Sequence, residues 1–479
     1  MRDFLAVWAG KTTLRISRRL GHGGSSLPGR VALRLQPAIL RRMSSNLRLG
    51  TVIVTGTNGK TTTARLLSTI LEDYGYVLVH NRSGANLVYG LVTAFLEFSR
   101  GGRSADIALM EVDEATVPEA VRQLRPLGVV VTNFFRDQLD RYGELDATVA
   151  MVSRGLDLMQ GQGFIALNAD DPLVGSLGRG RSGRIVHYGL VGPSPGRGSV
   201  SETREQRQCL VCGNELHYDV FFYGHLGQYS CPGCGLTRPK ADVRAERLRL
   251  NGTCGSRAHV TVAGGSPITL SMKLPGLYNV YNGLAALTAA LELGVPLERA
   301  SAAIGRAGPS FGRMERIAVN GRDILLALVK NPIGFDQVLR TLLEDREGTR
   351  AGIPPSEGPG RPGLQLLMAI NDRHADGTDI SWLWDVDFEM LSQPEAALRG
   401  IVVSGVRAHD MAVRLKYAGV RPGLVKCLPS LGRALEVALS ATGPGETLYV
   451  TPTYTAMLEI RDIISRGGFV PQFWESDLS

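Results

Sequence analysis

Short apolar runs alternate with longer segments of helical periodicity between residues 49 and 170. The apolar runs are rich in β-branched residues, which is typical of strands buried on both faces of a parallel sheet. The segments between them are long enough for the helices that connect parallel strands. The pattern therefore predicts an α/β fold with a doubly wound sheet, whose strands lie at 51–55, 106–110, 128–132 and 163–167.

A second series of apolar runs and helical segments fills the C-terminal part of the chain. It predicts a Rossmann-like α/β domain with strands at 324–329, 364–370, 399–404, 422–427 and 447–451, interrupted by a Gly/Pro-rich insertion at 347–363. Between the two series, residues 245–275 alternate as strands do. Residues 175–207 are rich in glycine, serine, proline and arginine, so we expect a linker or exposed loop there.

The first 48 residues mix arginines with apolar clusters. The segment Gly10-Lys11-Thr12-Thr13 has the letters of a phosphate-binding loop, but it has no glycine at position 5 and no turn before it. We predict a helix instead, with one face lined by Leu5, Val7, Trp8, Leu14 and Ile16.

The overall composition changes this picture little. A chain of 479 residues with 44% hydrophobic and 20% charged residues is typical of a globular protein of several domains. Its net charge of +8 favours phosphate-bearing or other anionic partners. The sequence shows no apolar run of membrane-spanning length and no export signal, so we expect a cytoplasmic protein. Peripheral contact with the inner face of the membrane stays open.

The first predicted strand runs into Thr55-Gly-Thr-Asn-Gly-Lys-Thr-Thr62, a variant phosphate-binding loop with Val54 where the strict motif has glycine. Glycines let the backbone approach an anion, the lysine meets the β- and γ-phosphates, and the next threonine binds Mg²⁺. A strand-to-helix turn with an incidental lysine is the alternative. We expect nucleotide binding by Gly56, Thr57, Asn58, Gly59, Lys60, Thr61 and Thr62, with Lys60 also catalytic.

Acidic residues follow the next two predicted strands, Glu111 and Glu114 after one, Asp137 and Asp140 after the other. The carboxyl ends of parallel strands share one edge of a sheet, which is also the edge of the glycine loop. A carboxylate there either caps a helix or holds Mg²⁺ opposite the phosphates. We predict that Glu111 acts in catalysis by holding Mg²⁺ together with Thr61, and that Glu114 is the weaker candidate.

Two C-x₂-C pairs stand 18 residues apart, and their members are Cys209, Cys212, Cys231 and Cys234. Such pairs present four thiolates to one tetrahedral ion and leave no open position, which predicts a structural zinc ribbon at about 205–240. A redox role would need a βαβ context that these motifs lack. A nucleic-acid-binding ribbon is the other alternative, although basic residues are no denser here than elsewhere.

Further polar residues mark the junction between the two series. Asn279 and Asn282 lie three residues apart at a predicted helix start, where they either read an adenine edge or cap the helix. Arg313 and Lys330 follow the junction, and we expect them to help bind the nucleotide phosphates.

Residues 375–389 gather acidic side chains around Trp382 and Trp384, including Asp379, Asp385 and Asp387. Clusters of aromatic and charged residues on loops are typical of interfaces. We therefore favour a catalytic or interface role over a plain acidic turn.

These motifs together resemble those of Mur ligases. The glycine loop, Glu111-Val-Asp-Glu114, Asn168-Ala-Asp-Asp-Pro172, the asparagine pair and Gly312-Arg313-Met-Glu315 are similar to the central ATP-binding domain and following linker of that family. The cysteine segment and the tryptophan segment resemble more closely the MurT family, the ligase subunits of lipid II isoglutaminyl synthase. The resemblance implies an extension at 1–48 packed on an ATP-binding domain at 49–308, and a MurT-type domain at 309–479.

The resemblance also implies an activity. Members of the family use ATP and Mg²⁺ to activate the α-carboxyl of D-glutamate in the lipid II stem peptide as an acyl phosphate. Ammonia from a separate GatD-type glutaminase then gives D-isoglutamine. In the family, an aspartate of the C-terminal domain completes the Cys-His pair of the glutaminase. Here Asp385 and Asp387 are the candidates and Asp379 is weaker, and no Cys-His pair of the chain itself stands out.

Two departures from the Mur ligase pattern bear on the reaction. No lysine occurs between Lys60 and Lys240, so the carbamylated lysine of many Mur ligases is absent or replaced, with Asp137 and Asp140 as candidates. Leu328 and Val329 precede Lys330 where amino-acid-adding members have Asp-Ser, which fits ammonia as the acceptor.

Two alternative functions stay open. The chain could be a stand-alone amino-acid ligase similar to folylpolyglutamate synthase, or a zinc-ribbon ATPase that binds nucleic acid. We expect no nucleic-acid partner.

Overall fold

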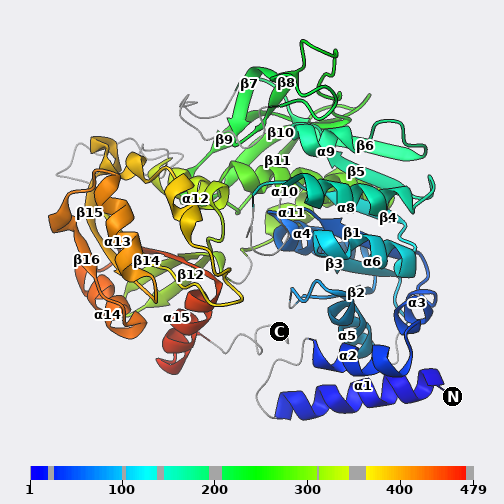
Figure 1. The fold of residues 1–479 in the computed structure, drawn as a ribbon, viewed down its shortest axis with the longest axis horizontal. Helices are drawn as coiled ribbons and strands as arrows, with labels where there is room; N and C mark the ends of the chain where they lie inside the picture. The colour runs from blue at the N-terminus through cyan, green and yellow to red at the C-terminus, as the bar shows by residue number, and fades with distance from the viewer. Residues whose placement is uncertain are drawn as a thin grey trace.

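The computed structural model describes residues 2–19, 26–82, 84–99, 104–136, 145–193, 208–309, 312–344 and 363–470. Two sheets flanked by helices lie side by side (Figure 1), which confirms the predicted α/β class. The predicted domain boundaries at 48/49 and 308/309 stay predictions.

The first sheet has the strand order β11-β10-β9-β6-β5-β4-β1-β3-β2. From β2 to β9 neighbouring strands are parallel, and β9, β10 and β11 are antiparallel. The strand bounds are β1 (Gly50–Thr55), β2 (Leu78–His80), β3 (Ile107–Glu111), β4 (Gly128–Val131), β5 (Phe164–Asn168), β6 (Arg184–Leu190), β9 (Val243–Leu250), β10 (Ser256–Val262) and β11 (Ile268–Met272).

Helices cover both faces of this sheet because its strands alternate their side chains between two cores. Val52 and Val54 of β1 face a core shared with α4 (Lys60–Tyr74), α10 (Leu277–Glu292) and α11 (Leu297–Arg306). Ile53 faces the opposite core. That core is shared with α5 (Val88–Phe98), α6 (Val117–Leu124), α8 (Leu145–Asp157) and α9 (Pro172–Ser176). A short turn, η1 (Glu114–Thr116), leads into α6.

The second sheet has the order β12-β13-β17-β14-β15-β16, parallel from β13 onward. Its strands are β12 (Arg313–Val319), β13 (Arg322–Ala327), β14 (Leu364–Ala369), β15 (Leu398–Ser404), β16 (Val425–Cys427) and β17 (Thr447–Pro452). One face packs on α12 (Pro332–Glu344), α13 (Ala408–Tyr417), η3 (Ser381–Asp385) and η4 (Phe388–Ser392), the other on α14 (Leu431–Ala441) and α15 (Tyr454–Arg466). The chain also forms the short helical turns η2 (Gly252–Cys254), η5 (Pro394–Ala396) and η6 (Pro422–Leu424).

The predicted loop at 175–207 is partly wrong. β6 (Arg184–Leu190) runs through it and joins β5 to β9, and α9 ends within it. The strand is flanked by Gly183 and Gly192, so its apolar inner residues were hidden by the composition of the surrounding segment. Between β6 and β9, a separate hairpin of β7 (His217–Tyr223) and β8 (Leu226–Ser230) projects from the sheet (Figure 1). The structure also adds β2 and β12, which the sequence pattern did not reveal.

The N-terminal extension forms α1 (Arg2–Arg19), α2 (Leu27–Leu35) and α3 (Ile39–Ser44), packed on α5 and α6. The helix predicted over Gly10–Thr13 is confirmed, but its predicted apolar face is wrong. The side of α1 that meets α2 and α5 buries Ala6, Gly10, Leu14 and Ser17, and most of the larger apolar residues face outward. Mostly small residues occupy the inner face of α1 because the helices approach one another closely. A Cβ atom on Gly10 would lie 2.6 Å from Leu96 Cδ1.

Candidate active site

The glycine loop joins the C-terminus of β1 to the N-terminus of α4, as predicted. Gly56 and Gly59 have φ angles of 117° and 86°, a region that residues with a Cβ rarely enter. Their surroundings also leave no space for a side chain, because a Cβ would lie 2.3 Å from Thr132 Oγ1 and 2.0 Å from Asn282 Oδ1, respectively. Glycine is therefore required at both positions for two reasons: the backbone has a positive φ angle, and the neighbouring side chains leave no space for a Cβ atom.

Asn133, at the end of β4, holds the middle of the loop. Its Oδ1 accepts from the Asn58 amide N–H at 2.9 Å, and its Nδ2 donates to the Asn58 carbonyl at 3.0 Å. The Asn133 carbonyl accepts from the Thr57 N–H at 2.8 Å. The loop is thus held in shape by the adjacent strand end. A polar residue directly after a predicted strand was the available signal, and the sequence analysis gave it no role.

Lys60 begins α4 and is buried beneath the loop. Its Nζ donates to the Gly56 carbonyl and lies 3.2 Å from Glu114 Oε2. Both side chains are at most 10% exposed. Glu114 therefore balances the lysine charge at this edge of the sheet, and it is Glu111 that faces Thr61.

Glu111, at the end of β3, accepts a hydrogen bond of 3.1 Å from Thr61 Oγ1. Burial raises the pKa of its carboxyl, while Lys60, Arg313 and the Thr61 hydroxyl act in the opposite direction. The Asn81 side chain bonds both the N–H and the C=O of Glu111, at 2.9 and 2.8 Å. A rigid, buried carboxylate beside a hydroxyl is an oxygen donor set of the kind that Mg²⁺ prefers.

Residues of the second sheet reach the same loop. Lys330 Nζ donates to the Thr57 carbonyl at 3.1 Å, and Arg313 Nη2 lies 3.5 Å from Thr61 Oγ1. The adjacent Asn331, which the sequence analysis left without a role, is 1% exposed and exchanges amide hydrogen bonds with Asn58 at 3.0 and 3.3 Å. Burial lowers the pKa of Arg313, and Glu111 opposes that shift. The structure thus brings Arg313 and Lys330 to the loop, although about 250 residues separate them from it in sequence.

A cavity of about 780 Å³, which includes space open to solvent, lies between the loop, α10 and the second sheet. Both predicted asparagines line it, and both also stabilise the start of α10. Asn279 Nδ2 donates to the Pro275 carbonyl at 2.7 Å, and Asn282 Nδ2 donates to Asn279 Oδ1 at 3.0 Å. The two roles left open by the sequence are therefore not exclusive. The residues that line the cavity include Asn58, Gly59, Thr62, Phe135, Tyr223, Tyr278, Asn279, Asn282, Arg313, Lys330, and Ile333 and Gln337 of α12.

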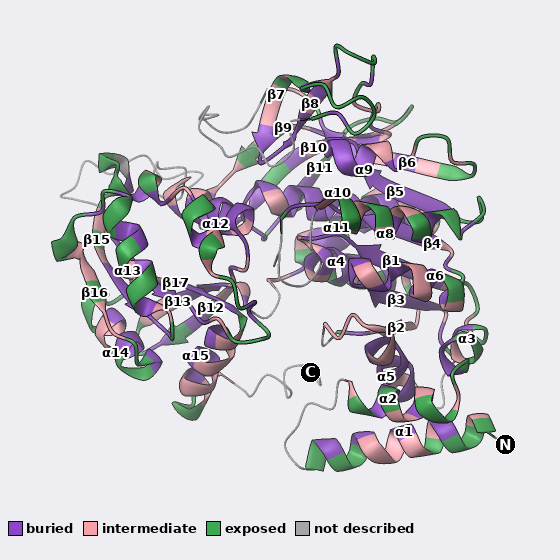
Figure 2. Cartoon of the chain, in the orientation of Figure 1, coloured by how far each residue is buried: buried purple, intermediate pink, exposed green. Residues whose placement is uncertain are grey.

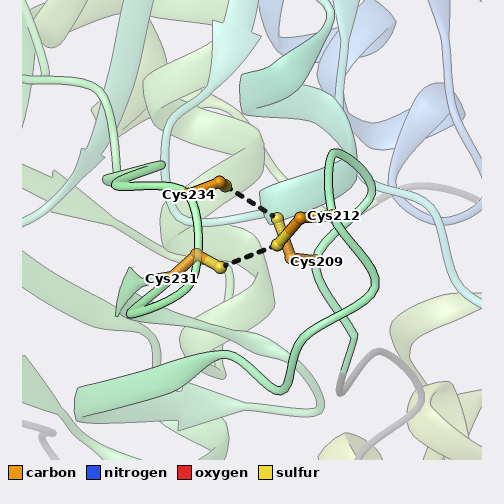
Figure 3. Close-up of side chains that lie close together, drawn as sticks. All are labelled: Cys209, Cys212, Cys231 and Cys234. Atoms are coloured by element: carbon orange, nitrogen blue, oxygen red, sulfur yellow. Dashed lines mark hydrogen bonds between the residues drawn. The ribbon is translucent and has the colours of Figure 1, made fainter.

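The four cysteines of the hairpin come together as predicted (Figure 3). The Sγ atoms of Cys209 and Cys234 are 3.6 Å apart, those of Cys212 and Cys231 are 3.4 Å apart, and all four lie within 4.8 Å of one another. Thiolates around a tetrahedral zinc ion would be about 3.8 Å apart, given a Zn–S bond of about 2.3 Å. The cluster can therefore bind a metal ion with little rearrangement.

The turn Asn168-Ala-Asp-Asp-Pro172 ties this hairpin to the rest of the molecule. Asp171 caps α9, as an Asx-type turn should, and its carboxylate also lies 3.3 Å from the buried His225 Nε2. Asp170 forms an ion pair with Arg238 and accepts from the Leu190 N–H at 2.7 Å and the Tyr281 hydroxyl at 2.8 Å. One buried carboxylate thus links the cysteine segment, the sheet and α10.

The aspartates of the tryptophan segment differ in their surroundings. Asp385 ends η3 and is exposed. Asp387 is half-buried, lies 3.8 Å from Arg340, and burial raises the pKa of its carboxyl. Asp379 accepts from the N–H and hydroxyl of Ser381, at 2.8 and 2.9 Å. Asp379 and Asp385 are thus both exposed, and of these two it is Asp379 whose carboxylate is engaged by Ser381.

Arg414 of α13, which the sequence did not flag, fixes this segment. Its guanidinium bonds both Glu389 carboxylate oxygens, at 2.9 and 2.8 Å, and donates to the carbonyls of Leu383 and Val386. It also lies 5.5 Å from the centre of the Trp384 ring. Trp384 is 54% exposed, and beside it Tyr417 is 71% exposed. Asp385 therefore stands next to an exposed aromatic patch.

One Cys-His contact does occur in the second sheet. Cys427 Sγ lies 3.5 Å from His409 Nδ1 near the surface. Burial raises the pKa of the Cys427 thiol, which is opposite to the shift that activates a cysteine nucleophile. This pair is not poised for glutamine hydrolysis. Asp137 and Asp140, the suggested replacements for the missing lysine, lie outside the described residues.

Comparison with known proteins decides the family. The Mur ligase middle domain matches residues 54–290, and the MurT ligase C-terminal domain matches residues 328–457. The chain is 32% identical to the MurT subunit of lipid II isoglutaminyl synthase (glutamine-hydrolyzing) from Staphylococcus aureus strain COL, covering 89% of this chain and 90% of that protein. The chain belongs to the MurT family. The MurT subunit from Streptococcus pneumoniae R6 is also 32% identical, over 97% of both chains.

Solved structures agree on the fold of this MurT-family chain. A pseudomurein peptide ligase type C from Methanothermus fervidus has a TM-score of 0.65 at 21% identity, covering 89% of this chain and 80% of that one. A folylpolyglutamate synthase from Mycobacterium tuberculosis has a TM-score of 0.58 at 13% identity, covering 93% and 95%. At these identities the likeness concerns the fold alone. The resemblance to Mur ligases and MurT drawn from the sequence is confirmed.

Proposed function

We propose that the chain is the ligase subunit of a lipid II isoglutaminyl synthase. It would use ATP to convert the α-carboxyl of D-glutamate in the lipid II stem peptide into the amide, with ammonia supplied by a GatD-type glutaminase. The observation that carries the proposal is the meeting of Lys60, Thr61 and Glu111 of the first sheet with Arg313 and Lys330 of the second, in a protein whose relatives bear that name.

The proposed reaction has two steps. A carboxylate oxygen of the substrate attacks the γ-phosphorus of ATP, ADP leaves, and an acyl phosphate forms. Ammonia then attacks the acyl carbon, phosphate leaves with the bond electrons, and the nitrogen gives up one proton to the released phosphate, which leaves the amide. In the first step, the cationic Lys60, Arg313 and Lys330 would neutralise the charge of the transferred phosphoryl group.

Glu111 and Thr61 are the residues that would hold Mg²⁺ in this site. When bound, the ion neutralises phosphate charge and orients the transferred group. Asn81 keeps the Glu111 backbone fixed, and Glu111 itself is only 5% exposed. Asn279, Asn282 and the apolar residues near them line the part of the cavity in which we place the adenine.

The proposal is tested with the chain and its glutaminase purified together. We expect amidation of lipid II that needs ATP and is driven by glutamine or by ammonium, with one ADP formed for each amide. Lys60→Ala should abolish amidation with glutamine and with ammonium alike. Lys240→Ala, which changes a lysine far from the loop in sequence, should leave both reactions intact. Incorporation of an amino acid in place of ammonia would instead identify the stand-alone amino-acid ligase, and the proposal would be wrong.

We further propose that the metal of the four-cysteine cluster is zinc and that it is structural. Four cysteines close the coordination shell, and the hydrogen bonds of Asp170 and Asp171 connect the cluster to the sheet. Elemental analysis of the purified chain should give one zinc per molecule. Cys231→Ser should lose it, and Cys254→Ser, which changes an exposed cysteine elsewhere, should retain it.

Asp385 is the residue that we propose for completing the Cys-His pair of the glutaminase. It is exposed, it adjoins the Trp384 and Tyr417 patch, and Arg414 holds the segment in place. Asp385→Asn should therefore abolish the glutamine-driven reaction and leave the ammonium-driven one unchanged. Asp387→Asn is the matched control. If Asp387→Asn alone shows that selective loss, the assignment of Asp385 is incorrect.

A further inference from the structure

The positive charge of this protein is concentrated in its first 48 residues. They contain nine arginines and one lysine against a single acidic residue, Asp3, and so carry a net charge of +9. The whole chain has 53 basic and 45 acidic residues, which leaves residues 49–479 with a net charge of −1. An anionic surface would therefore be attracted to the N-terminal extension more strongly than to the rest of the chain taken as a whole.

Helix α1 of this extension also exposes large apolar side chains. Phe4 is 74% exposed, Trp8 59%, Ile16 54% and Leu5 48%. Its inner face against α2 and α5 is formed largely by small residues, as described above, so the larger apolar groups are left on the outside. Figure 2 shows α1 at the margin of the molecule, with exposed, intermediate and buried residues alternating along it. The described part of the chain has no helix long and apolar enough to cross a membrane.

Arginines share this outer face. Positions 4, 8, 15 and 19 follow one another at helical spacing, so Phe4, Trp8, Arg15 and Arg19 lie on one side of α1. All four are exposed. We call these four residues the outer face of α1. Exposed Trp and Phe near arginines, whose long side chains can reach lipid phosphates, are features of helices that lie in the interface of a membrane.

We propose that the outer face of α1 docks this protein on an anionic phospholipid surface. Phe4 and Trp8 would enter the boundary between headgroups and acyl chains, and Arg15 and Arg19 would bind lipid phosphates. The near-zero charge of residues 49–479 would turn the extension toward the membrane. The benefit for catalysis, which is access to a lipid-linked substrate, rests on the proposed function; the docking itself does not.

The test is flotation of the complete chain, with its glutaminase bound, on vesicles of phosphatidylcholine alone or mixed with phosphatidylglycerol and cardiolipin. We expect binding to the anionic vesicles only, and weaker binding as salt rises. The double variant Phe4→Ser/Trp8→Ser should reduce partitioning by about tenfold or more. Arg15→Gln/Arg19→Gln should reduce it as well and should flatten the salt dependence. The control Leu158→Ser/Arg154→Gln changes exposed residues of the same kinds away from α1 and should bind normally.

Activity separates docking from folding and from the proposed function. The Phe4/Trp8 variant should amidate detergent-solubilised lipid II at the wild-type rate and be slower on lipid II held in anionic vesicles. Equal binding of wild type and this variant to anionic vesicles would overturn the proposal. So would loss of the glutaminase, or of self-association, on changing Phe4 and Trp8, because the face would then be a protein interface. Vesicle binding without any amidation would leave docking intact and sink the proposed function alone.

Discussion

Asp170 provides the most direct test of how the cysteine segment is coupled to the nucleotide cavity. Its carboxylate is fully buried and binds three partners from different elements: Arg238, the Leu190 N–H and the Tyr281 hydroxyl. Burial raises the pKa of this carboxyl, whereas Arg238 and the hydrogen bonds from Leu190 and Tyr281 act in the opposite direction. Asp170→Ala would leave the three partners without the acceptor that they share.

The expected loss is large. Removing one member of a buried ion pair costs about 3–5 kcal/mol, because the remaining charge stays desolvated. For a domain of this size each kcal/mol corresponds to a shift of about 2–4 °C, so the unfolding transition of the first sheet should fall by about 6–20 °C. Replacing the pair as a whole, with Asp170→Ala and Arg238→Met together, should recover part of that loss.

Calorimetry measures the transition, and hydrogen exchange locates the loss. We expect faster exchange in the β7–β8 hairpin and at the start of α10, where Tyr281 lies. The control is Asp157→Ala, which removes a pair whose aspartate is 62% exposed and should cost about 1 kcal/mol or less. If Asp170→Ala unfolds within the error of Asp157→Ala, or if exchange rises elsewhere only, the role assigned to Asp170 is refuted.

Three further predictions concern the loop and its metal site. Gly59→Ala should add about 1–2 kcal/mol of left-handed backbone strain and displace Asn282, so its nucleotide affinity in a direct binding assay should fall. The control is Gly75→Ala, whose Cβ would meet nothing within 4 Å, and equal affinities of the two variants would contradict the prediction. Glu111→Gln should end ATP-dependent turnover yet raise the melting temperature, because burial raises the pKa of the Glu111 carboxyl above its ordinary value of 4.5. The stabilising contribution of this carboxyl is complete below pH 4.5 and is lost as the pH rises through the pKa of the folded state. The increase in melting temperature should therefore grow from pH 4.5 toward neutrality, and an increase that stays constant with pH would count against the prediction. Lys330→Ala should lower kcat by about 100-fold with little change in folding, as measured by ADP release and circular dichroism; a change in KM for ATP alone would show that Lys330 binds the ground state only.

Several features of the site followed from local sequence because the physics that produces them is local. A glycine loop between a β-branched strand and a helix has few backbone solutions, and Lys60 and Thr61 occupy fixed places in it. The spacing of the two cysteine pairs likewise predicted a cluster that the structure assembles. The ends of parallel strands meet at one edge of a sheet, so the sequence pattern also predicts that Glu111 lies beside the loop.

Other features depended on packing between distant segments. Asn331 and Arg313 meet the loop only because the second sheet lies against the first. The inner face of α1 was misjudged because hydrophobicity favours large residues inside, whereas the close approach of α2 and α5 admits small ones. The strand β6 was hidden by its glycine-rich flanks, and its pairing with β5 and β9 is what makes it a strand.

The sequence by itself determined the fold class, the phosphate loop, the cysteine cluster and the family, because each is encoded in the spacing of a few neighbouring residues. Tertiary structure alone decided which charges face one another: Glu114 on Lys60, and Asp170 on Arg238. The reason is physical. Burial strengthens an interaction between charges and makes an unpaired charge costly, and burial is set by how distant parts of the chain pack.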